Sequence, residues 1–247
     1  MGIMNIFLAV AIAIIVSYLL GSIPFAFIMA RAFKGIDIRK TGSGNVGAMN
    51  VIYAVGLLPG LLVGVLDVGK GALAVYLGTL LCQPSNPSGL VLLIVQMVCG
   101  LAAIAGHNYP AFLGFRRGGR GGATAIGVLC YLIPMGMPFF LLLLLIVLAI
   151  TRYLTISYAV AFLAFPIVVW MQWVTPIDAW LQTTLPALSW MRSRSTDPVQ
   201  HTMLIVYSIV LILIPVLMYI PRIKEIMSKS GGSFKKAAVH RSVKDRP

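Results

Sequence analysis

Acidic side chains are scarce in this chain, and charged side chains of either sign are few. Asp and Glu together number 6, and charged residues make up 10% of the 247 residues, whereas soluble domains carry about 25%. Hydrophobic residues account for 60%, so a soluble fold of this length would lack the polar surface that it needs. The composition therefore excludes an ordinary soluble protein and predicts a membrane protein.

Cysteine is also rare. The 3 cysteines, Cys82, Cys99 and Cys130, have neither the even count of a disulfide framework nor the paired spacing of a zinc site. We expect buried thiols without a metal role. Because the carboxylates are too few and too scattered for a magnesium-dependent mechanism, we expect neither a metal nor another cofactor.

The apolar residues come in long blocks. They cover residues 4–30, 57–82, 90–106, 121–150, 154–174 and 203–220. Each block approaches or exceeds the roughly 20 residues that span a hydrocarbon core of about 30 Å. Block 121–150 contains Pro134, Gly136 and Pro138, which break a helix. We therefore expect two short spans there, residues 121–132 and 139–150, and seven crossings in all, whereas block 4–30 should form one helix.

Lys and Arg fall into clusters between and after these blocks. The clusters lie at residues 31–40, 116–120, 152 and 222–246. With seven crossings, all of them lie on the cytoplasmic side, as the positive-inside rule requires, and the amino terminus lies outside. A six-crossing fold would place Arg152 or the basic tail on the wrong side, so it ranks second. The prediction is an all-α, polytopic fold with one transmembrane domain, residues 1–227, and a basic, disordered cytoplasmic tail, residues 228–247.

The net charge of +13 is better explained by anionic lipid head groups than by nucleic acid, because the charges flank membrane segments. The lipid bilayer is therefore the expected partner, and no nucleic acid is expected.

Polar residues and glycines gather in the segment 35–50, which we call loop 1. Gly42, Gly44 and Gly47 leave backbone N–H groups accessible, and such a loop running into a helix can wrap an anion. The side-chain donors in loop 1 are Arg39, Lys40, Ser43, Asn45 and Asn50. This profile predicts a phosphate site, although glycines alone are also compatible with a flexible connection.

A second such segment, residues 106–124, is called loop 2. Arg116, Arg117 and Arg120 alternate with glycines there at the start of a helix, which predicts a second anion site by the same reasoning. His107 at its beginning is equally compatible with a core or capping role and with a ligand role. Asp67 and Lys70, one helical turn apart in an apolar block, are expected to form a structural ion pair.

Several motifs, in order, carry a family resemblance. They are Gly21-Ser22-Ile23-Pro24-Phe25, the run 42–48 (GSGNVGA), Asp67 with Lys70-Gly71, the run 106–115 (GHNYPAFLGF), and Gly118-Gly119-Arg120-Gly121 followed by Ala123-Thr124. Over about the first 155 residues, the chain resembles the bacterial acyl-phosphate:glycerol-3-phosphate acyltransferase family. The resemblance implies transfer of a fatty acyl group from acyl phosphate to the 1-hydroxyl of glycerol 3-phosphate, giving lysophosphatidic acid for phospholipid synthesis. It also implies a multi-pass enzyme of the bacterial inner membrane, and we expect a monomer.

The resemblance also assigns residues to the site. Ser43, Asn45 and Arg120 would be catalytic. The substrate-binding residues would be Arg39, Gly42, Gly44, Gly47, Asn50, Lys70, His107, Arg116, Arg117, Gly118, Gly119, Gly121, Thr124, Thr155 and Arg222. The arginines of loop 2 stand where the family usually has lysines, and Asn50 and Lys70 would support loop 1.

The chain departs from the family pattern at several positions. Met49, Tyr53 and Thr155 stand where the family usually has Thr, Arg and Ser, and Arg222 and Glu225 stand where it has His and Asn. Two alternatives therefore remain beside the acyltransferase. One is a relative that is non-catalytic or that takes another polyol phosphate. The other is a transporter of a phosphorylated solute, which the small number of ionisable residues within the spans and the lack of an inverted repeat disfavour.

Overall fold

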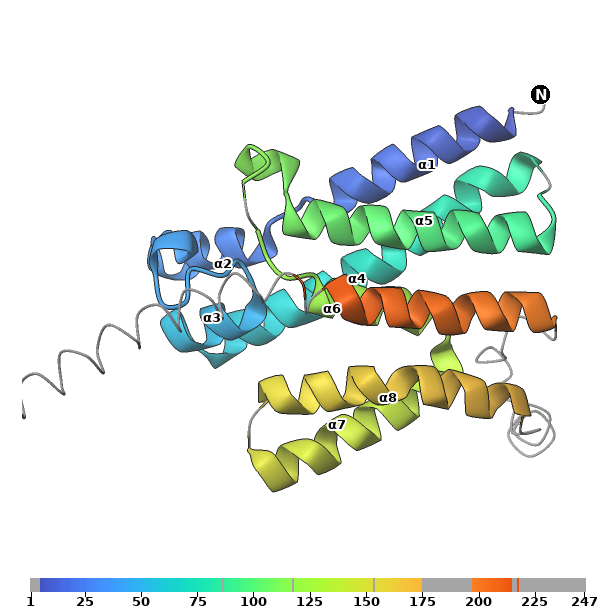
Figure 1. The fold of residues 1–247 in the computed structure, drawn as a ribbon. Helices are drawn as coiled ribbons and strands as arrows, with labels where there is room; N and C mark the ends of the chain where they lie inside the picture. Colours follow the sequence, from blue (N-terminus) through green and yellow to red (C-terminus); the bar gives the residue numbers. More distant parts are fainter. Residues whose placement is uncertain are drawn as a thin grey trace, which may run out of the picture.

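The computed structural model describes residues 5–85, 87–116, 118–152, 154–174, 197–214 and 217, without the side chains of residues 154, 155, 172 and 173. Within these ranges all regular structure is helical (Figure 1). The α-helices are α1 (Ile6–Gly21), α2 (Phe25–Lys34), α3 (Ala48–Ala54), α4 (Leu57–Cys82), α5 (Gly89–Asn108), α6 (Gly122–Leu132), α7 (Met137–Thr151), α8 (Leu154–Val174) and the helix Pro198–Ile214. Four 3-10 turns join them: η1 (Ile38–Lys40), η2 (Gln83–Ser85), η3 (Ala111–Leu113) and η4 (Pro134–Gly136). The predicted tail, residues 228–247, lies outside the described residues.

The helices confirm an integral membrane protein. Four stretches are long and apolar enough to cross a bilayer: Ile6–Lys34, Leu57–Ser85, Gly89–Leu113 and Pro134–Thr151. Three shorter apolar helices, Gly122–Leu132, Ile156–Met171 and Pro198–Ile214, complete the set. Large apolar side chains such as Leu142 (57% exposed) and Leu163 (64% exposed) cover the outside, as expected of surfaces that face lipid rather than water.

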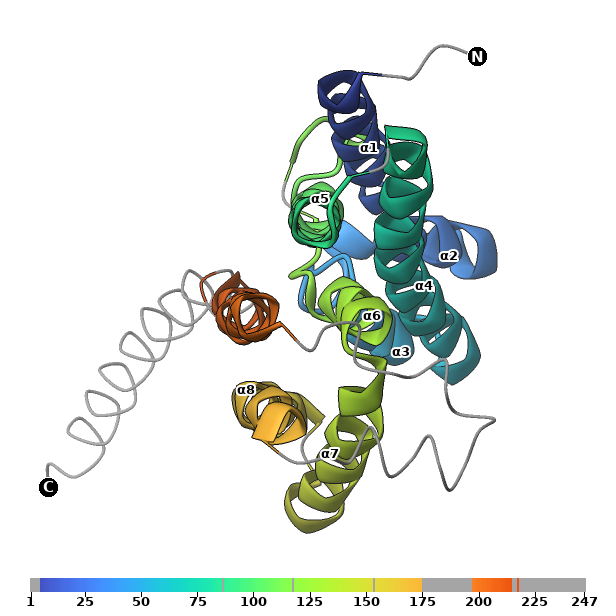
Figure 2. The ribbon, with the colours of Figure 1, turned by 90° about the vertical axis from the view of Figure 1, so that its right-hand side faces the viewer.

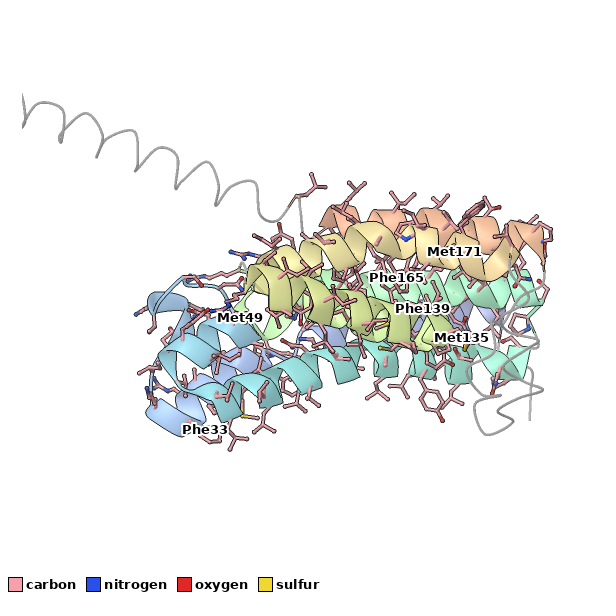
Figure 3. The ribbon with its side chains drawn as sticks, turned by 90° about the horizontal axis from the view of Figure 1, so that it is seen from below. Phe33, Met49, Met135, Phe139, Phe165 and Met171 are labelled. Atoms are coloured by element: carbon pink, nitrogen blue, oxygen red, sulfur yellow. The ribbon has the colours of Figure 1, made fainter. Side chains whose placement is uncertain are left out.

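These seven helical stretches alternate in direction along one bundle axis (Figure 1). As a result, loop 1, loop 2 and the end of α7 lie at the end of the molecule drawn on the left, opposite the start of α1. Figure 3 places Phe33 and Met49 at this same end and Met135 and Met171 toward the other. The number of membrane crossings, for which we predicted seven, stays a prediction. Which end faces the cytoplasm stays a prediction.

The first apolar block differs from the single helix that we predicted. Helix α1 ends at Gly21, and α2 begins at Phe25 and leaves the direction of α1 (Figure 2). Pro24 has no N–H to continue the helix, which explains the break. In contrast, the predicted break in block 121–150 is confirmed, because the turn η4 (Pro134–Gly136) separates α6 from α7.

Three apolar clusters lie in the described interior, and two of them concern the site. The larger joins α4, α5, α6, α7, α8 and the helix Pro198–Ile214, and in it the ring of Phe140 packs edge-on against Phe162 (5.2 Å between centroids) and Phe165 (5.9 Å). The smaller, around Ile38, Val51 and Val63, joins α2, loop 1, α3 and the start of α4. Loop 1 is therefore anchored by its own hydrophobic cluster at the end of the bundle.

Candidate functional site

The side chain of Asn50 organises loop 1. It is 4% exposed, and its Nδ2 donates to the carbonyl oxygens of Ile38 (3.1 Å) and Thr41 (3.0 Å). Nδ2 also donates to the carbonyl oxygen of Asn45 (3.0 Å), and Oδ1 accepts from the N–H of Ser43 (3.1 Å). One buried amide therefore closes the loop on itself, which confirms the predicted supporting position of Asn50.

The glycines of loop 1 allow the backbone conformation of the loop. Gly42 and Gly44 have φ values of +58° and +69°, a region that residues with a Cβ rarely adopt. A Cβ at Gly42 would overlap Oδ1 of Asn50. The N–H of Gly44 donates to Thr41 (3.0 Å) and that of Asn45 to the Ser43 hydroxyl (3.4 Å). Of the three glycine N–H groups predicted to be accessible, that of Gly44 is used inside the loop. The exposed side chain of Ser43 and the half-buried Asn45 add to the polar surface of the loop.

Arg39 is held by Asp37. Its Nη2 lies 2.7 Å from Asp37 Oδ2 and its Nε 2.9 Å from Oδ1, and its guanidinium lies 4.9 Å from the centre of the Phe27 ring. The hydrogen bond from Arg39 lowers the pKa of Asp37 to about 2. Because its guanidinium fork is occupied by a carboxylate, Arg39 is placed to stiffen loop 1 rather than to offer phosphate an open fork.

This ion pair should be insensitive to pH over the physiological range. A carboxyl whose pKa is lower in the folded state stabilises the fold above its unfolded pKa, and the stabilisation is lost as pH falls through the folded value, here about 2. For the reaction that the family resemblance implies, we expect Asp37→Asn to lower the rate about 3-fold to 10-fold, by the same factor from about pH 5 to about pH 8. Initial rates of both proteins across this range test it. A wild-type titration step near neutrality that Asp37→Asn abolishes would contradict it.

Loop 2 folds back onto the end of α5. The N–H of Gly118 donates to the carbonyl oxygen of Asn108 (2.8 Å), and the N–H of Gly119 to that of His107 (3.1 Å). A Cβ at Gly119 would lie 2.7 Å from the carbonyl oxygen of Val46 in loop 1. The two loops predicted to bind anions are therefore in contact.

Helix α6 begins directly after this contact. Gly121 has φ +78° and precedes the first turn, which has no side-chain cap and no acidic residue. Unpaired N–H groups and the helix dipole favour an anion at such an end. Arg120, half-buried beside it, adds a cation, and Thr124 in the first turn is fully buried.

Three buried ionisable residues lie beneath the loops. Lys70 Nζ is 2.8 Å from Asp67 Oδ1, which confirms the predicted ion pair, and His107 Nδ1 is 3.6 Å from the same oxygen. Lys70 also donates to the carbonyl oxygen of Ile23 (3.0 Å) at the break between α1 and α2. In this structure Lys70 therefore supports that break rather than loop 1, for which we predicted it.

The remaining predicted residues are distributed as follows. Arg116 is exposed and Gly47 is half-buried at the start of α3. Arg117, Arg222 and the side chain of Thr155 lie outside the described residues. Asp67 and its link to His107 were not predicted as part of the site. Tyr53, at the position where we expected a substrate-binding Arg in the family, is 81% exposed on α3.

The fold defines a polytopic membrane protein, and the two loops predicted to bind anions meet at one end of its helix bundle. The sequence profile of the family described as glycerol-3-phosphate acyltransferase matches residues 11–229. The chain belongs to the glycerol-3-phosphate acyltransferase family.

Individual relatives agree with this assignment. A protein named glycerol-3-phosphate acyltransferase 2 from Dehalococcoides mccartyi is 42% identical over 245 residues, 98% of this chain and 100% of the relative. A glycerol-3-phosphate acyltransferase from Chlorobaculum tepidum is 36% identical over 159 residues, 63% of this chain and 68% of its own length. Crystal structures of PlsY, an integral membrane glycerol 3-phosphate acyltransferase, match at TM-scores of 0.64 in its glycerol 3-phosphate form and 0.62 in its lysophosphatidic acid form. Each covers 89% of this chain and 92% of PlsY at 28% identity.

Proposed function

We propose that this protein transfers a fatty acyl group from acyl phosphate to the 1-hydroxyl of glycerol 3-phosphate, producing lysophosphatidic acid and phosphate for phospholipid synthesis. The observation that carries the proposal is the contact between loop 1 and loop 2 at Gly119 and Val46. Both substrates carry phosphate, and two adjoining anion sites bring them together. The lipid-facing helices beside the loops can take the acyl chain.

The reaction needs alignment more than side-chain chemistry. The hydroxyl oxygen attacks the carbonyl carbon of the acyl phosphate, the bond from that carbon to the phosphate oxygen breaks, and phosphate leaves. The hydroxyl proton passes to a phosphate oxygen. Ser43 and Asn45 of loop 1, with Arg120 before α6, orient the two anions and stabilise the negative charge that develops at the carbonyl oxygen.

We further propose the inner membrane of a bacterium as the location, with the loop-bearing end of the bundle facing the cytoplasm, and a monomer as the working unit. The basic clusters at 31–40 and 116–120 support this orientation under the positive-inside rule. Phosphorylated substrates made in the cytoplasm would reach this end directly.

The experiment is acyl transfer in proteoliposomes with palmitoyl phosphate and labelled glycerol 3-phosphate. We expect labelled lysophosphatidic acid from the wild type and a loss of about 100-fold or more in Arg120→Ala, because a charge-stabilising donor to the reacting phosphate is removed. Arg31→Ala is the matched control. Arg31 is exposed on α2 and donates to the carbonyl oxygen of Gly35 (3.2 Å), so its loss should leave the rate within about 2-fold.

Absence of product from the wild type, while another family member is active in the same vesicles, would reject the proposed reaction. Full activity in Arg120→Ala would reject the proposed site. Tyr53 stands where the family usually has a substrate-binding Arg, so the acceptor substrate could differ. Assays with other polyol phosphates in place of glycerol 3-phosphate test this.

A further inference from the structure

The buried imidazole of His107 lies between an ion pair and the segment 118–120 of loop 2. His107 is 7% exposed, and Asp67 and Lys70 are 2% and 4% exposed. On one side, Nδ1 of His107 is 3.6 Å from Asp67 Oδ1. On the other side, a Cβ at Gly119 would overlap Nε2 of His107 and lie 2.7 Å from its Cε1. The ring therefore packs against the backbone of Gly119.

Asp67 lies beside the Nδ1 edge of this ring. The same Oδ1 atom receives Lys70 Nζ at 2.8 Å, so the carboxylate is anchored on α4 before it meets the imidazole. The Nδ1 edge of the ring faces this carboxylate, and the Nε2 edge faces Gly119. Two rigid helices, α4 and α5, thus hold the ring in one position.

Gly119 in turn lies between His107 and loop 1. Its N–H donates to the carbonyl oxygen of His107 (3.1 Å), and a Cβ there would lie 2.7 Å from the carbonyl oxygen of Val46. A shift of the imidazole would move Gly119 relative to loop 1. It would also move the adjacent Arg120, on which the proposed reaction depends.

We propose that His107, held at Nδ1 by Asp67, is a positioning residue that sets loop 2 against loop 1 through the contact of its Nε2 side with Gly119. This inference rests on the proposed acyl transfer, and it assigns His107 a place behind the substrates rather than in contact with them. Misplacement of aligned groups by about 1 Å can cost about 100-fold in rate. The effect should therefore fall on kcat.

Two variants separate the two sides of the imidazole. The amide of Gln reaches the place of Nε2, whereas the shorter Asn reaches only the place of Nδ1. We expect kcat to fall about 3-fold to 10-fold in His107→Gln, which keeps the contact with Gly119 but loses the one with Asp67. In His107→Asn, which loses the contact with Gly119, kcat should fall about 10-fold to 100-fold, with KM for glycerol 3-phosphate changed by less than about 3-fold in both variants. Equal kcat in the two variants, a larger loss in His107→Gln, or an effect confined to KM would overturn the proposal.

A second test leaves His107 in place. Gly119→Ala should lower kcat about 100-fold, because the new methyl group pushes segment 118–120 off the imidazole. Gly69→Ala is its control, since a Cβ at Gly69 on α4 meets nothing within 4 Å and Ala favours the helix. If Gly119→Ala matches Gly69→Ala in kcat, the packing does not control the reaction and the proposal fails.

A third measurement does not depend on turnover, so it separates this inference from the proposed function. The variant Gly119→Ala should lower the thermal unfolding midpoint in detergent when it is made in the wild type or in His107→Gln. In the His107→Asn background the drop should be smaller, because the shorter Asn side chain leaves room for the new methyl group. Equal shifts in all three backgrounds would contradict the contact. If the wild type makes no lysophosphatidic acid while this pattern is found, the reaction assignment fails and the positioning contact stands.

Discussion

Replacement of Asn50 by Leu should abolish acyl transfer, with kcat/KM reduced at least about 100-fold. The substitution keeps the size of the side chain but removes all four hydrogen bonds that close loop 1. Three carbonyl oxygens lose this donor, although that of Ile38 still accepts from the N–H of Thr41 and that of Thr41 from the N–H of Gly44. A buried polar group left without a partner costs about 1–3 kcal/mol. Loop 1 would open, and Ser43 and Asn45 would lose the positions that the proposed reaction needs. Lysophosphatidic acid formation in proteoliposomes measures the effect.

Asn50→Asp separates the acceptor role of this side chain from its donor role. It keeps the acceptor for the N–H of Ser43 but turns a carboxylate toward the three carbonyl oxygens, so we expect a similar loss. Asn5→Ala serves as the control. Asn5 caps α1 at the opposite end of the bundle through the N–H of Phe7 (2.9 Å), and its loss should cost about 1 kcal/mol of stability with no change in rate. An Asn50→Leu enzyme with wild-type activity would show that loop 1 is not part of the site.

The arrangement of helices follows from local features of the sequence. The lengths of the apolar blocks and the prolines at 134 and 138 are sufficient to place α4, α6 and α7, because span length and helix breaking depend only on residues near one another in the chain. The break before Phe25 depends on an equally local feature, Pro24. It was missed because block 4–30 is apolar throughout.

The site was less predictable because its decisive contacts join distant residues. The spacing of Asp67 and Lys70 predicts their ion pair, since residues three apart meet on a helix. Nothing in the sequence places His107, on α5, against Asp67, on α4, because that contact depends on how the two helices pack. Arg39 was expected to bind substrate, yet it pairs with Asp37, the only acid of loop 1. The one sequence feature that could have indicated this pairing is that Asp37 stands alone as an acid beside the cations of loop 1.

Lys70→Met should be among the most destabilising single substitutions in the bundle. It removes the cation from Asp67, which is 2% exposed, and leaves the carbonyl oxygen of Ile23 without its 3.0 Å donor. Loss of one partner of a buried ion pair costs about 3–5 kcal/mol, because the remaining charge stays buried and uncompensated. At about 2–4 °C per kcal/mol for a chain of this size, the thermal unfolding midpoint in detergent should fall by roughly 10 °C.

The double variant Asp67→Leu with Lys70→Met should recover most of this stability, because two apolar side chains of similar volume replace two buried charges. Its acyl transfer should nevertheless stay low, since His107 loses the carboxylate that orients it. Lys34→Met is the matched control: Lys34 also donates to a backbone carbonyl, that of Ala54 (2.9 Å), but on an exposed surface, where the loss should be within about 1 kcal/mol. If Lys70→Met is no less stable than Lys34→Met, the buried pair does not anchor the fold. If the double variant regains full activity along with stability, Asp67 serves packing alone and has no part in positioning His107.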